Sequence, residues 1–176
     1  MCSSDLVMAF DGHVWIHDGQ LYLSGDPHGS PDWDRCFTAN PVGIVGVYGG
    51  EAILLTGLHT GHVGMRVDVA AADPGANLID YEDVVEIDFA PTEGELHLVE
   101  WAGEDSHPLG ALPAGPGNHR LRYHARGMDA GHDLDTADEH DGEPVDSYLV
   151  QVWPARPSLP ATLKLTSGYA RSCQAG

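Results

Sequence analysis

The sequence contains very few basic residues. Lys164 is its single lysine, and seven arginines raise the basic total to 8, against 27 aspartates and glutamates and a formal net charge of −19. A charge of this sign repels nucleic-acid phosphates and anionic membranes, so we expect neither as a partner. It attracts cations and basic proteins, although GC-rich coding or a saline habitat produces the same composition and also keeps a protein soluble.

Cysteine is scarce, and long apolar runs are absent. Cys2, Cys36 and Cys173 form no CxxC pair and are odd in number, which argues against a zinc knuckle and a disulfide framework. Reduced thiols are typical of a cytoplasmic protein. No stretch approaches the ~18 apolar residues of a membrane span, and no export signal is recognisable. Residues 1–6 match the translation of a sequencing adapter, which predicts an artefactual or disordered start.

The motifs of the common catalytic classes are also missing. The chain has no GxSxG nucleophile elbow, no Walker phosphate loop and no HExxH zinc motif. Acyl and phosphoryl transfer therefore have no support. The sequence favours a non-enzymatic protein, and no cofactor is predicted.

What the chain does contain is a repeated alternation of apolar and polar residues in short runs, which is typical of β-strands. The clearest run is 63–69. Asp18-Gly19 and Gly49-Gly50 each separate two such runs and predict hairpins, because these residues tolerate positive φ. Further strands are expected at 85–89, 96–98, 120–126, 148–153 and 163–165.

These runs predict an all-β, antiparallel β-sandwich or jelly-roll-like fold of eight to nine strands with little or no helix, since no helical segments separate the strands. We expect a single domain over residues 7–166. Residues 128–146 are rich in Asp, His and Gly and are predicted to form a flexible acidic loop. Residues 167–176 are predicted to form a flexible tail.

Three arginines and a histidine lie at two-residue spacing within 120–126, so they project from one face of a strand. One interpretation is an anion or carboxylate clamp, because arginine offers bidentate donors. The other, which the sequence favours, is cross-strand pairing with acidic residues such as Glu86, Asp88 or Asp68. The candidate binding residues are Arg120, Arg122, His124, Arg126 and Asp129.

The segment 128–146 offers many oxygen and imidazole ligands, but its spacing does not match a calcium loop or a zinc motif. Solvated charge is the favoured interpretation, and no metal site is assigned. The weak candidates for metal ligands are His132, Asp133, Asp135 and His140.

Three tryptophans suggest a further alternative. Trp15, Trp101 and Trp153 are out of phase with their core-facing neighbours, as in sandwiches that stack sugars on an outer face. A rim or dimer contact explains the same pattern and is favoured.

Two long runs carry a family resemblance. The run DVVEI at 83–87, leading to Gly94, and the run GPGNHRLRYHARGMD at 115–129, which continues to YLVQVWP at 148–154, resemble a group of uncharacterised actinobacterial proteins with an RLRYHARGMDAG…YLVQVWPA signature. This resemblance implies a β-sandwich and no catalytic residues. The strand order and the run PGNHRLRY are similar, more distantly, to competence protein J, the DNA-entry nuclease inhibitor, and to related immunity-type proteins.

The leading hypothesis is a non-enzymatic acidic binding module, an inhibitor or immunity-type protein that engages a basic partner such as a nuclease or toxin. One alternative is a metal- or anion-binding β-sandwich enzyme that uses residues 120–129 and the His/Asp segment. Another is a carbohydrate-binding module. The sequence does not indicate an oligomeric state.

Overall fold

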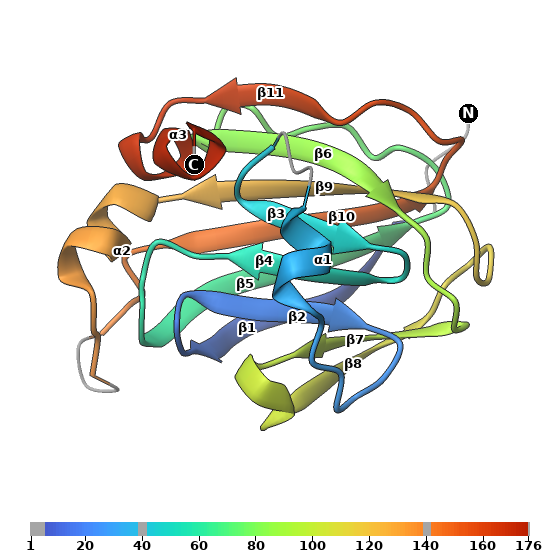
Figure 1. The fold of residues 1–176 in the computed structure, drawn as a ribbon, viewed down its shortest axis with the longest axis horizontal. Coiled ribbons are helices and arrows are strands. Elements are labelled where there is room, and N and C mark those ends of the chain that lie inside the picture. Colours follow the sequence, from blue (N-terminus) through green and yellow to red (C-terminus); the bar gives the residue numbers. More distant parts are fainter. Residues whose placement is uncertain (1–5, 39–41, 139–141, 176) are drawn as a thin grey trace.

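The computed structural model describes residues 6–38, 42–138 and 142–175, which form two β-sheets stacked face to face (Figure 1). Sheet A has the strand order β1-β5-β10-β9-β6-β11, and sheet B has the order β3-β4-β2-β7-β8. The strands of sheet A are β1 (Leu6–Ile16), β5 (Gly61–Ala70), β6 (Asp83–Phe89), β9 (His119–Arg126), β10 (Ser147–Pro154) and β11 (Ala161–Leu165). Those of sheet B are β2 (Gln20–Ser24), β3 (Val45–Tyr48), β4 (Glu51–Leu55), β7 (Glu95–Val99) and β8 (Ser106–Ala111).

The core lies between the two sheets and follows from the alternation in the sequence. Each strand turns alternate residues inward, so the apolar positions of the predicted strands meet in one layer. In β5, for example, Val63, Met65, Val67 and Val69 are all buried. The predicted β-sandwich is therefore confirmed.

The number and direction of the strands differ from the prediction. The described residues form eleven strands, and β10 pairs with β5 in parallel, whereas every other pair is antiparallel. A parallel pair is possible here because β5 and β10 are joined by a long connection that contains several other strands. Alternation predicts which residues a strand buries, but it carries no information on the direction of its neighbour.

The two predicted hairpins have different outcomes. Gly49-Gly50 joins β3 and β4 as an antiparallel hairpin, as expected. Asp18 and Gly19 do form a tight turn with positive φ of 56° and 63°. However, β1 pairs with β5 in sheet A and β2 pairs with β4 and β7 in sheet B, so this turn passes the chain between the sheets.

Three short helices replace segments that were predicted to lack structure or helix. They are α1 (Trp33–Phe37), α2 (Met128–Leu134) and α3 (Gly168–Ala175), and a 3-10 turn, η1, covers Trp101–Gly103. The acidic loop at 128–146 thus begins as a helix, and the tail at 167–176 is mostly helical. Both helices depend on tertiary contacts, since Met128 and Ala170 are buried and α2 lies against α3 (Figure 1).

Leu6, the first residue of β1, pairs with Ala70 in sheet A. Residues 1–5 lie outside the described residues. None of the described helices is long and apolar enough to cross a membrane.

Candidate functional site

The predicted arginine strand, β9, lies in the middle of sheet A, and its polar face is covered by the segment 71–82. Arg122 is only 5% exposed. Its Nε donates to Glu86 Oε2 over 2.8 Å, and its two Nη atoms donate to the two carboxylate oxygens of Asp73 over 2.9 and 3.2 Å. Nη1 also donates to Gln151 Oε1, and the guanidinium lies 4.5 Å from the ring centroid of Trp153. Arg122 thus fastens the segment 71–82 onto the sheet.

Arg120 holds the segment between β10 and β11 against the same face of sheet A. It donates through Nη1 to Asp88 Oδ1 over 2.9 Å and to the carbonyl of Ser158. Its Nη2 donates to the carbonyl of Leu159 over 2.7 Å, with Glu86 at 3.5 Å. The structure therefore pairs Arg120 and Arg122 with Glu86 and Asp88, which is the cross-strand alternative, while the third acidic candidate, Asp68, pairs with Arg66.

His124 is fully buried on the same face and is neutral at pH 7. Its Nε2 accepts a hydrogen bond from the backbone N–H of Asn77, so its Nδ1 carries the proton toward the carbonyl of Leu149. Burial lowers the pKa of His124 to about 4. A neutral, enclosed imidazole adds no charge to an anion clamp.

Arg126, by contrast, is exposed at the end of β9. It lines a shallow groove of about 420 Å³ together with Arg66 and Tyr81, and the acids Asp68 and Asp80 line the same groove. The guanidinium of Arg126 and that of Arg66 therefore do not form a purely basic site. The anion clamp stays a prediction that the other arginines of the strand do not favour.

Asp129, on α2, caps the N-terminus of α3. Its Oδ1 accepts from the backbone N–H of Tyr169 over 2.8 Å and its Oδ2 from that of Gly168 over 3.0 Å, at the start of α3. Ser167 Oγ accepts from the N–H of Ala170, so the first three amides of α3 all have acceptors. The N–H groups of Tyr169 and Gly168 hold the pKa of Asp129 below its usual range.

Replacing Asp129 with alanine is expected to lower the free energy of unfolding by about 1 kcal/mol, as for other lost helix caps. Because the pKa of Asp129 is lowered by folding, its contribution is present above about pH 4 and is lost as the pH falls through the folded-state pKa. Urea unfolding at pH 7 and at pH 3 measures both effects. Asp133→Ala, an exposed change on the same helix, serves as the control, and equal losses for both variants would contradict the prediction.

The other candidates of this segment do not converge on one point. His132 stacks on Tyr169 at a centroid distance of 4.7 Å, Asp133 is exposed, and Asp135 accepts from Thr136 Oγ1 beyond the end of α2. His140 lies outside the described residues. Within the described ranges, the three residues whose ligand atoms lie close enough to share an ion are Glu100, Asp105 and His107, which the sequence did not single out.

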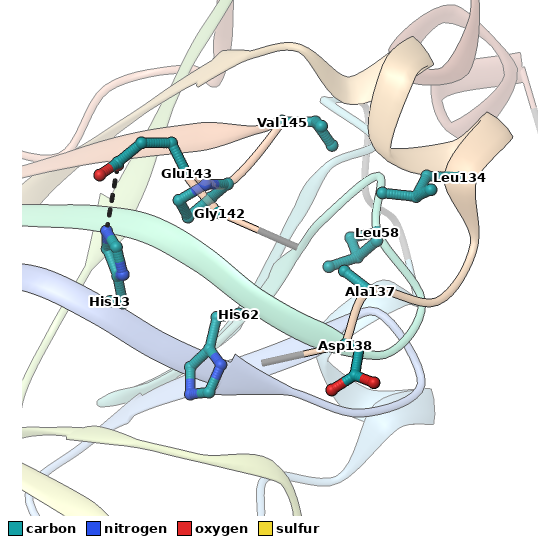
Figure 2. Close-up of a pocket in the computed structure, with 10 residues that line it drawn as sticks. His13, Leu58, His62, Leu134, Ala137, Asp138, Gly142, Glu143 and Val145 are labelled. Carbon is teal, nitrogen blue, oxygen red and sulfur yellow. Dashed lines mark ion pairs between the residues drawn. The ribbon is translucent and has the colours of Figure 1, made fainter. Parts of the chain in front are cut away.

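A pocket of about 270 Å³ lies beside this segment, between β1, β5 and the chain that leads into β10 (Figure 2). His13 comes from β1 and faces Glu143 across 3.7 Å, whereas His62 comes from β5 and lies nearer Asp138 (Figure 2). The His13–Glu143 pair and His62 therefore line different parts of the pocket (Figure 2). Their ligand atoms do not meet the spacing of a shared ion, so we assign no metal to it.

The tryptophans predicted to form a sugar platform are dispersed. Trp153 is buried beneath Arg122, Trp15 packs edge-on against His62, and Trp101 packs against His17. Trp153 is therefore not available to stack a sugar ring. The packing of these side chains against their neighbours corresponds to the rim alternative.

The basic residues are distributed unevenly between the two layers. Residues 20–60 and 90–118, which contain every element of sheet B together with α1 and η1, hold a single basic residue, Arg35. The same residues contain four carboxylates in the first range and five in the second. They are Asp26, Asp32, Asp34, Glu51, Glu93, Glu95, Glu100, Glu104 and Asp105. The rest of the chain holds the other 18 carboxylates and seven basic residues, so both layers are acidic and they differ mainly in how many basic residues accompany the carboxylates.

Comparisons with known proteins support the fold. A scan against models of known protein families finds no match, and a search of curated proteins finds no significant relative. Among solved structures, the product of crocagin biosynthetic gene J is similar with a TM-score of 0.57 and 12% identity, over 88% of this chain and 100% of its own. ComJ from Bacillus subtilis, an inhibitor of the DNA-degrading activity of NucA, is similar with a TM-score of 0.56 and 16% identity, over 85% of this chain and 98% of its own. The likeness in fold to competence protein J is thereby confirmed.

Proposed function

We propose that this protein is a non-enzymatic, inhibitor-type binding protein whose acidic surface engages a basic partner such as a nuclease. The likeness to ComJ carries the proposal, because it extends over nearly the whole of a protein that inhibits a nuclease. The net charge of −19 supports it further, since carboxylates are the natural complement of a basic surface.

The internal pairing of the arginines fits the same function. Three of them form ion pairs with acids on the outer face of sheet A, namely Arg66, Arg120 and Arg122. Three of the eight basic residues are thus paired with carboxylates of the protein itself. The exposed carboxylates of the sheet B layer have Arg35 as the single arginine or lysine of that layer, which favours attraction of a cationic partner.

The test is the rate of nucleic-acid degradation by NucA and by the basic ribonuclease barnase, each with and without an excess of this protein. We expect one of the two rates to fall at stoichiometric addition at low salt, and we expect the effect to weaken at high salt because exposed charges are screened. ComJ added to NucA is the positive control. Unchanged rates for both enzymes, together with no complex in size-exclusion chromatography at low salt, would contradict the proposal.

A further inference from the structure

The described residues expose two large aromatic side chains, and both lie at the same corner of sheet B. Trp33 on α1 is 45% exposed, and Tyr48 at the end of β3 is 56% exposed. Arg35 joins them, because its guanidinium carbon lies 5.4 Å from the centre of the Tyr48 ring. Tryptophan, tyrosine and arginine are the residue types that most often dominate the binding energy of protein interfaces.

The corner is held in a defined conformation by the packing beneath it. Asp32 caps α1 by accepting from the N–H of Arg35 over 3.1 Å, and Cys36 is buried against sheet B. Gly46 in β3 permits this close approach, since a Cβ there would lie 2.8 Å from the carbonyl oxygen of Cys36. Trp33 packs against Phe37 with tilted rings at a centroid distance of 4.4 Å. The exposed side chains therefore project from an ordered base, which lowers the entropy cost of binding.

Three carboxylates surround these side chains. Asp32 and Asp34 flank Trp33 on α1, and Glu51 is paired with Tyr48 across the β3–β4 hairpin. The pKa of Cys36, beneath the corner, is raised first by burial and then by the charges of Glu51 and Asp32, so both carboxylates act on the same small region. Beside them, a shallow hollow of about 510 Å³ is lined by Arg35, Cys36, Thr38, Val47 and Tyr48.

We propose that the residues Asp32, Trp33, Asp34, Arg35, Tyr48 and Glu51, here named the corner patch, dock a lysine- and arginine-rich surface of a protein partner. The aromatic rings supply area that loses water on contact, and the carboxylates pair with basic side chains at the rim. This inference rests on the proposed function and adds where the partner binds.

Two sets of substitutions, each of which removes three negative charges, distinguish the effect of the corner patch on binding from the effect of the overall charge of the protein. The patch set is Asp32→Asn, Asp34→Asn and Glu51→Gln, in which asparagine at position 32 keeps a good helix cap. The control set is Asp133→Asn, Asp135→Asn and Glu143→Gln, all exposed and distant in sequence. Tyr48→Ala is added as a single change at an exposed side chain, and circular dichroism checks that each variant is folded.

The affinity of each variant is measured for NucA by surface-immobilised binding and for a labelled decapeptide of alternating lysine and arginine by fluorescence anisotropy at low salt. We expect the patch set to weaken peptide binding by about tenfold and the control set by no more than about twofold. We expect Tyr48→Ala to weaken NucA binding by about thirtyfold, as at an interface hot spot.

The outcomes separate the two proposals. Equal weakening by the patch and control sets would overturn the corner patch as the docking surface and would leave the inhibitor proposal intact. Peptide binding that depends on the patch set, with no binding of NucA or barnase to the unmodified protein, would support the docking surface and count against the nuclease partner. No peptide binding by the unmodified protein at low salt would overturn the corner patch.

Discussion

Replacing Arg122 with alanine is expected to lower the free energy of unfolding by about 3–5 kcal/mol, the range measured when one partner of a buried ion pair is removed. The side chain donates to Glu86, Asp73 and Gln151 and covers Trp153. Without it, Glu86 keeps only the longer contact with Arg120, at 3.5 Å, and a carboxylate that is 16% exposed loses most of its compensation.

Urea unfolding at pH 7 measures this loss, and hydrogen exchange of the amides of residues 73–77 shows whether the covering segment opens. Arg126→Ala is the matched control, because Arg126 is exposed on the same strand and should change stability by less than about 0.5 kcal/mol. Arg122→Lys should fall between the two, since lysine keeps the charge but not the planar set of donors. A loss below about 1 kcal/mol for Arg122→Ala would contradict the structural role assigned to the network.

Replacing Asp146 with alanine is expected to cost about 2–4 kcal/mol, because the change leaves buried donors without an acceptor. The Asp146 carboxylate accepts from the hydroxyl of Tyr148 over 2.6 Å and from the backbone N–H of Leu58 over 3.1 Å. The Tyr148 oxygen in turn accepts from the N–H of Gly57. This chain of bonds holds the β4–β5 connection against β10. Thermal and urea unfolding measure the cost.

Asp146→Asn separates the hydrogen bonds from the charge. Its amide oxygen can accept both bonds, so most of the stability lost in the alanine variant should be retained. Burial raises the pKa of Asp146, so the stability that Asp146 contributes is present below its unfolded-state pKa and is lost as the pH rises through the higher folded-state pKa. The stability of Asp146→Asn relative to the unmodified protein should therefore increase between about pH 4 and pH 7. A difference that is constant with pH would show that Asp146 does not titrate differently on folding.

Hydrophobic alternation determined the β-sandwich and much of its core without any tertiary information. The inward residues of β5, β9 and β10 are those that the two-residue period selects, because a strand turns alternate side chains to opposite faces whatever it packs against. The same period placed Arg120, Arg122 and His124 on one outward face, together with Glu86 and Asp88 as their partners. The net charge, which motivates the proposed basic partner, is also a property of the sequence alone.

Only the tertiary structure decided what covers the outward face of sheet A. The segment 71–82 contains no strong helix or strand pattern, yet it lies over Arg122 and His124 and turns a face expected to be wet into a buried polar layer. Such a contact depends on specific hydrogen bonds between residues about 50 positions apart, which local periodicity does not record.

The same limit applies to the helices and to the proposed docking surface. Asp129, a candidate binding residue from the sequence, caps α3 because the fold brings two segments 40 residues apart into contact. Arg35 and Tyr48 became neighbours only when α1 packed on β3. The burial pattern along a strand is determined by local geometry and can be predicted from the sequence. Contacts between segments that are distant in sequence are determined by the packing of the whole chain.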